Sequence, residues 1–544
     1  MKTIWRTWGH LAARRRACML ALALSSLAVS AAALIPYGVP VPSVHDEYGL
    51  LFGAQTLAQG RLSNPPHPLW QHFETIYVLS QPTYASAKPP GQSLAMALGI
   101  TLTGQPIVGV WIASALMIAA LYWMLLAWTS PRWALFGGLI TLFCLGTWGD
   151  WTETYWGPSV AGLGSALLLG GLGWLRRRDR LRDGLLLGAG LAILANTRPY
   201  EGLAASLPVA IALVAWGVRL APPVRVRRVL RATLPIALSV GLGLSFLLWS
   251  NLRITGSVFE LPYSAYAKTY MARSMPLLDL LGVGGKSRPV EFRHDVFQKM
   301  ANVNFVPTPQ LHSAREIPYY IHRRLLDVWT GSVSYYFAPL GPVVLLLIPL
   351  LVRFRRLRLA LASFGVGFVA QMMPPWHEIR HFSPFVAATL LLLVATVRLL
   401  ASVQVTRRLA RRGIPLLVAL ACLFVGAGRA LEAGREPQLA SRSWCHERQR
   451  IEQHLAASGR HLIIVHYPGG HSVHREWVYN APDIDASAVV WARDMGAERN
   501  AELIAYFGDR QIWWLVPPPE YQGPPTLQPY HDRTEPMPES TLQK

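Results

Sequence analysis

Residues Ile107 to Trp128 read IVGVWIASALMIAALYWMLLAW, and this stretch decides the class of fold. Its 22 residues include no charged side chain. About 20 apolar helical residues cross the roughly 30 Å hydrocarbon core of a bilayer, so the stretch predicts a transmembrane helix. Similar runs recur along the 544-residue chain, of which 52% is hydrophobic and 15% charged. The sequence therefore predicts a mostly α-helical protein that crosses a membrane many times.

Ten further spans are expected. The weakest, Gly184 to Ala195, is short, and a re-entrant hairpin would show the same pattern. Arginine runs at Arg176–Arg182 and Arg225–Arg231 should both face the cytoplasm, so an even number of helices lies between them, giving about eleven in all. The other spans are predicted near Ala17–Ile35, Trp133–Thr147, Ser159–Leu175, Leu203–Val218, Leu234–Trp249, Leu340–Val352, Leu359–Met373, Phe385–Val403 and Ile414–Val425.

The basic residues follow the same topology. The net charge is +21, and the runs Arg14–Arg16, Arg353–Arg358 and Arg407–Arg412 lie in short connections that the positive-inside rule places in the cytoplasm. A nucleic-acid binder would gather such residues on a soluble module, so no nucleic-acid partner is expected. The first apolar run resembles a signal peptide, but we expect an uncleaved helix because a polar loop follows at once. The four cysteines predict neither a disulfide framework nor a zinc site.

The composition becomes that of a soluble protein from about Gly434, which predicts a membrane domain over residues 1–433 and a small extracytoplasmic α/β domain over residues 434–544. Strands are expected at His461–His466, Val489–Trp491 and Gln511–Val516, with a helix at Glu498–Tyr506, an order that closes as a right-handed parallel unit. The proline-rich end after Pro517 should be loose. Asp483-Ile-Asp485 resembles a metal motif but is better explained as a turn.

The first extracytoplasmic loop, His45 to Gly91, begins with His45-Asp46-Glu47. One explanation is structural, because acids after Ser43 resemble a capping box and are stabilised by the helix dipole. The other is functional: a carboxylate of Asp46 or Glu47 could act as a general base on an acceptor hydroxyl. The two explanations are evenly balanced from these residues alone.

Lys88 lies in the turn Lys88-Pro89-Pro90-Gly91 that closes this loop. A lysine beside two prolines is held on a stiff turn and is suited to meet a phosphate as a point charge. The alternative is an interfacial lysine that extends toward lipid head groups. Tyr84 and Trp70 of the same loop either stack on a sugar or belong to the aromatic belt of the membrane surface.

Three other segments carry polar side chains at helix ends. The loop from Gly149 to Gly157 contains Asp150, Glu153 and Tyr155, and Arg198 pairs most simply with Glu201. His377-Glu378-Ile379-Arg380-His381 is a literal zinc-protease motif. The flanking prolines, however, would hold its helix to little more than one turn. Arg380 and His381 are instead expected to face a polar cavity at the outer membrane surface.

Taken together, several segments resemble those of bacterial GT-C integral-membrane glycosyltransferases, relatives of the protein O-mannosyltransferases and the lipid A aminoarabinose transferase. The resemblance covers about Ala17 to Val403. It is carried by Asp46-Glu47-Tyr48, Asn64–Trp70, Tyr84–Gly91, Tyr155-Trp156-Gly157, Arg198–Gly202 and His381–Pro384.

This resemblance implies transfer of a sugar from a polyprenyl-phosphate donor to a glycan, lipid or protein acceptor outside the bacterial cytoplasmic membrane, usually with inversion. It places Asp46 at the reaction centre, Lys88 at the donor phosphate and either Asp150 or Glu153 as a second acid. Arg198, Arg380 and His381 are further candidates for phosphate contact, and Tyr84, Trp70 and Tyr155 for the sugar or lipid. The long segment Asn251–Thr330 would cover the site as a lid. No metal or other cofactor is implied.

Two other functions are compatible with parts of the sequence. A transporter or flippase for lipid-linked sugars would place charges and broken helices near the middle of the bilayer. The polar groups here gather in outer loops instead. An intramembrane zinc protease would use His377, Glu378 and His381.

Overall fold

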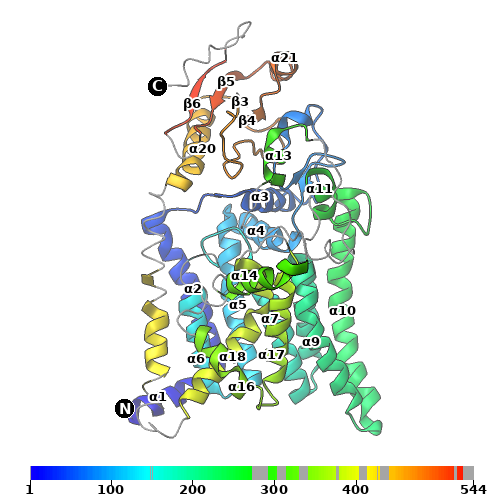
Figure 1. The fold of residues 1–544 in the computed structure, drawn as a ribbon, viewed down its shortest axis with the longest axis vertical. Helices are drawn as coiled ribbons and strands as arrows, with labels where there is room; N and C mark the ends of the chain where they lie inside the picture. Colours follow the sequence, from blue (N-terminus) through cyan, green and yellow to red (C-terminus); the bar gives the residue numbers. More distant parts are fainter. Residues whose placement is uncertain are drawn as a thin grey trace.

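A computed structural model gives the fold (Figure 1). The structure describes residues 2–146, 149, 151–271, 292–302, 314–329, 341–374, 379–402, 413, 415–424, 427–428, 440–519 and 523–530. Within these ranges, helices form an elongated bundle, and a small sheet lies beyond one end of it. The N-terminus lies at the opposite end of the bundle from this sheet.

All eleven predicted apolar spans coincide with helices, and six of the described helices are long and apolar enough to cross a membrane. The chain is a multipass membrane protein. The bundle helices are α2 (Arg15–Tyr37), α5 (Pro106–Trp128), α6 (Pro131–Leu145), α7 (Pro158–Arg178), α8 (Leu181–Thr197), α9 (Pro199–Val218), α10 (Pro222–Thr255), α16 (Gly341–Leu351), α17 (Arg358–Met372), α18 (Val386–Leu400) and a helix at Pro415–Phe424.

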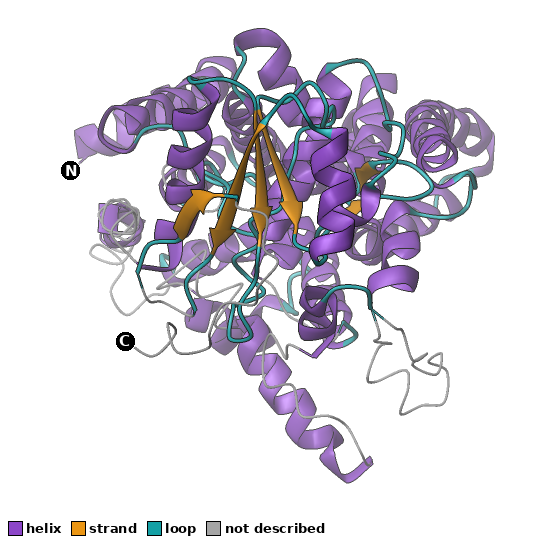
Figure 2. Ribbon diagram, turned by 90° about the horizontal axis from the view of Figure 1, so that it is seen from above, coloured by secondary structure: helices purple, strands orange, loops and turns teal. Residues whose placement is uncertain are grey.

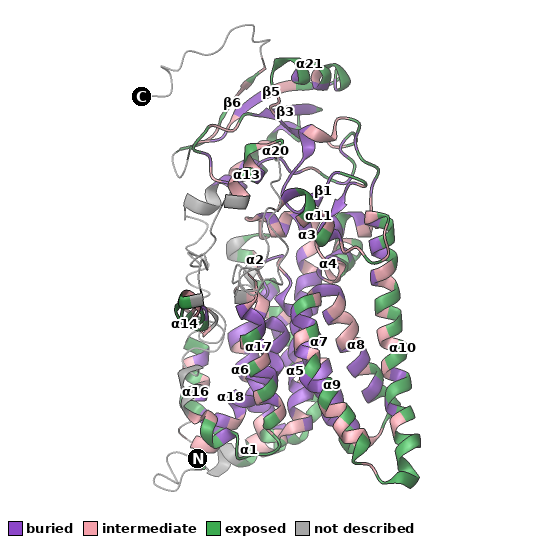
Figure 3. Cartoon of the chain, turned by 45° about the vertical axis from the view of Figure 1, so that its right-hand side comes forward, coloured by how far each residue is buried: buried purple, intermediate pink, exposed green. Residues whose placement is uncertain are grey.

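Burial separates central helices from peripheral ones (Figure 3). The apolar window of α7 is 89% buried, whereas that of α10 is only 17% buried. Leu238 and Leu242 of α10 are 58% and 68% exposed, which a helix facing lipid tolerates because its surroundings are as apolar as its side chains. Helix α7 is therefore the centre of the bundle, and α10 lines its edge.

Two short helices lie across the end of the bundle that faces the sheet (Figure 1). They are α3 (His45–Ala58) and α4 (Pro90–Thr103), and α4 was not predicted from the sequence. A Cβ at Gly53 would come within 2.7 Å of the Ser93 hydroxyl, so the glycine allows the two helices to approach closely. Ser93 Oγ donates a 2.8 Å hydrogen bond to the carbonyl of Leu50, which fixes the pair.

The loop between α3 and α4 folds around a two-stranded antiparallel ribbon, in which Val78 pairs with Ser86 and Leu79 with Ala85. The remaining short elements of this layer are the 3₁₀ turn η1 (Trp70–Phe73), β1 (Val78–Leu79), β2 (Ala85–Ser86), α11 (Pro262–Tyr270), α13 (Asp295–Asn302), η2 (Ala314–Glu316) and α14 (Ile317–Val328). At the far end of the bundle, α1 (Lys2–Ala13) precedes α2. At the end that faces the sheet, η4 (Ile379–Phe385) precedes α18.

The C-terminal sheet has the order β4-β3-β5-β6 and is seen from above in Figure 2. Strand β3 pairs in parallel with both β4 and β5, as the predicted strand–helix pattern requires, and β6 is antiparallel to β5. The expected loose end after Pro517 is wrong for Thr526–Pro529, because these residues pair with the edge of β5. The elements are α20 (Ala440–Ala456), β3 (His461–Val465), β4 (Val489–Arg493), α21 (Ala497–Tyr506), β5 (Gln511–Val516) and β6 (Thr526–Pro529).

Candidate active site

Asp46 and Lys88 meet at the end of the bundle, although 42 positions separate them in the sequence. The Lys88 ammonium donates a hydrogen bond to Oδ1 of Asp46 and forms an ion pair with it. Only 12% of the lysine side chain and 25% of the aspartate side chain is exposed. Gly49, one turn after Asp46, makes this approach possible, since a Cβ there would lie 3.1 Å from the Tyr77 backbone and 3.7 Å from Lys88.

Two tyrosines enclose the Lys88 ammonium. Its nitrogen lies 3.3 Å from the centre of the Tyr77 ring and 5.6 Å from that of Tyr263. Cation–π attraction to such rings holds an ammonium in place and is strongest where water is excluded. Tyr77 has a φ of +61°, which is uncommon for a tyrosine, and strained residues of this kind cluster at functional sites. Tyr77 was not predicted from the sequence, because a lone tyrosine between loop residues forms no pattern.

The charge of Lys88 keeps the carboxyl group of Asp46 ionised. Burial alone would raise the pKa of Asp46, but the charge and hydrogen bond of Lys88, with a smaller contribution from Arg198, hold that pKa below its ordinary value. Asp46 is therefore ionised throughout the neutral range. A ligand that drew Lys88 away would make Asp46 a stronger base.

Glu47 points to a different set of partners. Its Oε2 accepts hydrogen bonds from the backbone N–H of Ser43 (2.8 Å) and from the Ser43 hydroxyl, and its Oε1 accepts one from the N–H of Tyr155 (2.9 Å). The capping explanation thus belongs to Glu47 and not to Asp46. Both carboxylate oxygens of Glu47 tie loops to the start of α3, and its catalytic role stays a prediction.

The second loop lies against the first through Tyr155 and Gln92. The Tyr155 hydroxyl donates a 2.8 Å bond to the carbonyl of Pro40, and the Gln92 amide donates to the carbonyl of Tyr155. The ring of Tyr155 is 2% exposed, which leaves no face for a sugar. The nearby carboxyl of Glu153 has an oxygen without a described hydrogen-bond partner, and burial raises its pKa to about 7. Asp150, the other candidate acid, lies outside the described residues.

Further cations approach from α8, α9 and η4. A Cβ at Gly91 would lie 2.4 Å from the Thr197 hydroxyl, so the Lys88 turn rests directly on the residues before Arg198. Nδ1 of His381 is 3.6 Å from a carboxylate oxygen of Glu201. The Arg380 guanidinium lies 3.4 Å from the centre of the Trp156 ring. The charge of Arg198 contributes to the low pKa of Asp46, while Arg380 and His381 contact Trp156 and Glu201.

The remaining two candidates from the first loop lie elsewhere. Tyr84 is 4% exposed and packs edge-to-face on Phe52, with ring centres 4.6 Å apart. Trp70 contacts the guanidinium of Arg293, 4.7 Å from its ring centre. The ring of Tyr84 packs in the core of the loop, and its stacking on a sugar stays a prediction.

The connection between β3 and β4 of the C-terminal sheet rests on α3, the helix that carries Asp46. The rings of Tyr48 and Tyr479 are parallel within 4° and 4.1 Å apart, and His45 stacks on His474 at 5.6 Å. Arg493 of β4 donates a 2.7 Å bond to the backbone carbonyl of Glu74 in the first loop. Contacts of this kind transmit the position of the sheet to α3.

We expect Tyr479→Ala to lower the stability of this junction by about 3 to 5 kcal/mol, the usual cost of removing a buried aromatic ring. Thermal unfolding of the purified protein, followed by tryptophan fluorescence, measures the loss. Tyr506→Ala is the matched control, since Tyr506 of α21 is 46% exposed and should cost less than about 1 kcal/mol. Equal losses in the two variants would show that the Tyr48–Tyr479 stack does not hold the sheet on α3.

A metal site does not emerge from the described part of the chain. No group of three or more His, Cys, Asp or Glu side chains is placed there to hold an ion. His377 and Glu378 of the zinc-protease motif lie outside the described residues, and Asp485 contacts His67 and Tyr506 instead of a second acid.

The amino-acid sequence matches no protein-family model and no curated protein. The fold, however, is similar to that of solved structures. ArnT from Cupriavidus metallidurans bound to undecaprenyl phosphate is 13% identical, with a TM-score of 0.51 over 91% of this chain and 92% of that one. Its apo structure gives 12% identity and a TM-score of 0.52 over the same shares.

The Archaeoglobus fulgidus oligosaccharyltransferase tethered to an acceptor peptide is 10% identical, with a TM-score of 0.51 over 91% of this chain and 68% of that one. Identities this low establish the fold and not the activity. The resemblance seen in the loop motifs is therefore confirmed at the level of architecture, and the chain has the fold of the GT-C integral-membrane glycosyltransferases.

Proposed function

We propose that this protein transfers a sugar from a polyprenyl-phosphate donor to an acceptor hydroxyl or other nucleophile of a cell-envelope glycan, lipid or protein. The observation that carries the proposal is the pairing of Asp46 with Lys88 inside an aromatic enclosure at the end of the bundle. One structure with the same fold was solved with undecaprenyl phosphate bound, which supports this class of donor.

The pair supplies the two functions that an inverting transfer needs. Asp46 takes the proton from the acceptor as the acceptor oxygen bonds to the anomeric carbon of the sugar. The bond from that carbon to the phosphate oxygen breaks on the opposite face, and its electron pair leaves with the phosphate. Lys88 and Arg198 stabilise the negative charge that develops there. A phosphate needs no proton to leave, so one carboxylate is sufficient.

Binding of the donor also changes the pKa of Asp46. The phosphate competes with Asp46 for the Lys88 ammonium, and loss of that partner raises the pKa of Asp46. The base thus gains strength only when donor is present. In the absence of donor the ion pair keeps Asp46 weakly basic, which protects the site from abstracting protons without a sugar to transfer.

The ionisation of Glu153 should make the stability of the folded protein depend on pH. Its pKa is raised to about 7 by burial, so the folded protein holds a proton that the unfolded chain loses near pH 4.5. Stability from this group is full below pH 4.5 and is lost as the pH rises through 7. We expect Glu153→Gln to remove that loss, worth on the order of 1 to 2 kcal/mol after allowance for partial exposure.

Thermal unfolding of the wild type and Glu153→Gln at pH 5 and pH 8 tests this expectation. The variant should unfold at a higher temperature than the wild type at pH 8 and at the same temperature at pH 5. An identical pH dependence in both proteins would show that Glu153 is not held in its neutral form.

For orientation, we propose that the site and the C-terminal sheet face the outside of a bacterial cytoplasmic membrane and that the N-terminus faces the cytoplasm. The arginine-rich connections support this, since Arg176–Arg178 end α7 and Arg353–Arg356 follow the end of α16, and α16 lies toward the end of the bundle away from the sheet (Figure 1). We further propose a division into a membrane unit, residues 1–433, and a C-terminal unit, residues 434–544.

The test is reconstitution of the purified protein with defined polyprenyl-phosphate sugars and candidate acceptors, with mass spectrometry of the lipid products. A transferase releases sugar-free polyprenyl phosphate in proportion to the protein added. A flippase, the competing function, moves the lipid between leaflets and leaves the sugar–phosphate bond intact. Intact donor with accelerated transbilayer movement would replace the proposal by the flippase.

A further inference from the structure

A cavity of about 620 Å³ opens at the end of the bundle remote from the Asp46–Lys88 pair. It lies where α5, α16 and α18 end and where α17 begins. Its volume is in the range of ligand pockets, roughly 300 to 1,000 Å³. Nothing in the proposed transfer reaction uses this end of the molecule.

The lining combines two chemistries. Arg353, Arg355, Arg356 and Arg398 supply four positive charges, and no acidic side chain lines the cavity. Within the described part of the chain, no carboxylate pairs with any of the four; Arg398 donates only a long, 3.5 Å bond to the Thr129 hydroxyl. The rest of the wall is mostly apolar and includes Leu351, Leu357, Leu391, Val394 and Leu399.

The negative helix ends beside the cavity neutralise part of the positive charge of these arginines. The carboxyl ends of α5, α16 and α18 each carry roughly half a negative charge, which arginines at those ends offset. The four positive charges of the guanidinium groups exceed the combined negative charge of these three helix ends. The amino end of α17 opens on the same cavity, because its cap residue Leu357 lines it, and free N–H groups at such an end favour an anion.

We infer that this cavity binds an anionic membrane phospholipid, with the phosphate on the arginines and the first part of an acyl chain against the apolar wall. Basic pockets between transmembrane helices are suited to such head groups. A free phosphate would satisfy the arginines but leave the leucine and valine wall exposed to water. The lipid is favoured because it uses both parts of the lining.

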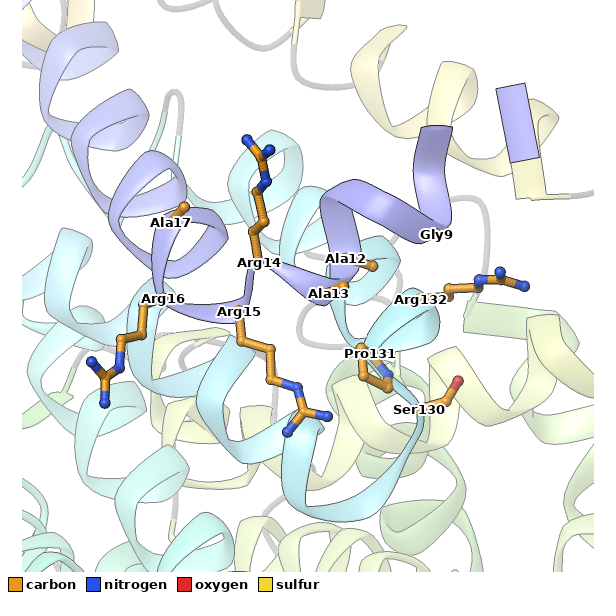
Figure 4. A pocket seen from close by; sticks show the side chains of 10 residues that line it. All are labelled: Gly9, Ala12, Ala13, Arg14, Arg15, Arg16, Ala17, Ser130, Pro131 and Arg132. Atoms are coloured by element: carbon orange, nitrogen blue, oxygen red, sulfur yellow. The ribbon is translucent and has the colours of Figure 1, made fainter. Parts of the chain in front are cut away.

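A second arginine-lined cavity at the same end of the bundle provides the comparison. It is lined by Arg14, Arg15, Arg16 and Arg132, but its apolar side chains are small ones, such as Ala12 and Ala17. Figure 4 shows that Arg14, Arg15 and Arg16 extend in different directions and do not converge. This cavity has similar charge without a wall for an acyl chain.

Native mass spectrometry of the purified full chain, titrated with phosphatidylglycerol or phosphatidylcholine of equal chain length, tests the inference. We expect preferential retention of phosphatidylglycerol. The combined variant Arg353→Gln, Arg356→Gln and Arg398→Gln should weaken retention about hundredfold, since each cation near an anionic lipid contributes about a factor of five to ten. The matched variant Arg14→Gln, Arg15→Gln and Arg16→Gln should change it less than about threefold.

Equal losses in the two triple variants would overturn the inference in favour of general surface charge. Ala395→Phe keeps every arginine and fills the apolar part of the cavity, so it should also weaken retention. Unchanged retention in Ala395→Phe would exclude the acyl chain from the wall. Displacement of phosphatidylglycerol by an equal concentration of inorganic phosphate would identify a free-anion site instead of a lipid site.

Discussion

Asp46→Asn should reduce sugar transfer about 100-fold to 10,000-fold, the usual contribution of a general base. Asparagine keeps the size of the side chain and a hydrogen-bond acceptor for Lys88 but cannot accept the proton of the acceptor. Donor binding should survive, because the Lys88 ammonium becomes more available to phosphate once the carboxylate is gone. The expected signature is therefore a large fall in kcat with an unchanged or lower KM for the donor, measured in the reconstituted transfer assay.

A matched control is available in the exposed ion pair of Arg460 with Asp509, which lies away from the site. Asp509→Asn makes the same chemical change there and should leave transfer within about twofold, as surface substitutions do. Full activity in Asp46→Asn would reject Asp46 as the base. A loss of equal size in Asp509→Asn would mean that the assay reports folding and not chemistry.

Lys88→Met should have the second largest effect. It removes the cation proposed to hold the departing phosphate, a change that costs about 100-fold to 1,000-fold in kcat when a stabilising group is lost. It also leaves Asp46 without its closest charge. Burial is then opposed only by smaller contributions such as that of Arg198, so the pKa of Asp46 rises, and Asp46 must be ionised to act as a base.

The pH dependence separates these two consequences. In the wild type, activity should persist to acidic pH, because the pKa of Asp46 lies below its ordinary value. In Lys88→Met the acidic limb of kcat/KM should move to higher pH, and Arg460→Met, which removes an exposed cation away from the site, should leave it in place. A limb that stays unmoved in Lys88→Met would show that Lys88 does not control the ionisation of Asp46.

The sequence predicted the bundle well because membrane crossing depends on composition. An uncharged run such as Ile107–Trp128 is stable in a bilayer as a helix, and the structure has a helix from Pro106 to Trp128. Helix α4 was missed for the opposite reason. Pro90–Thr103 lies across the end of the bundle, and its stability comes from packing against α3 at Gly53, which no local pattern records.

The charged residues of the candidate site could be predicted from the sequence, but the contacts between them could not. Asp46 and Lys88 stand out because they lie near the two ends of the first predicted extracytoplasmic loop, the acid just after the first apolar span and the lysine in the closing turn. Their contact depends on Gly49 and on the unusual backbone of Tyr77, which are properties of the folded loop. The separation of Asp46 from Glu47 likewise needed the structure, since adjacent acids in a first helical turn look equivalent until their partners, Lys88 and Ser43, are placed.

The C-terminal sheet illustrates the same limit. Its parallel strands follow from alternating apolar runs, but the stack of Tyr48 on Tyr479 joins residues more than 400 positions apart. Such contacts carry no local signal. They make the sheet part of the support of α3.

The proposed reaction centre depends most directly on where the donor phosphate binds. A structure of the protein in lipid with undecaprenyl phosphate bound would answer this, because the phosphate and both side chains would be seen together. We expect the phosphate on the ammonium of Lys88, with the Asp46–Lys88 ion pair opened and the Asp46 carboxylate turned to solvent or acceptor. A phosphate bound elsewhere, with the pair of Asp46 and Lys88 intact, would contradict the proposed reaction centre.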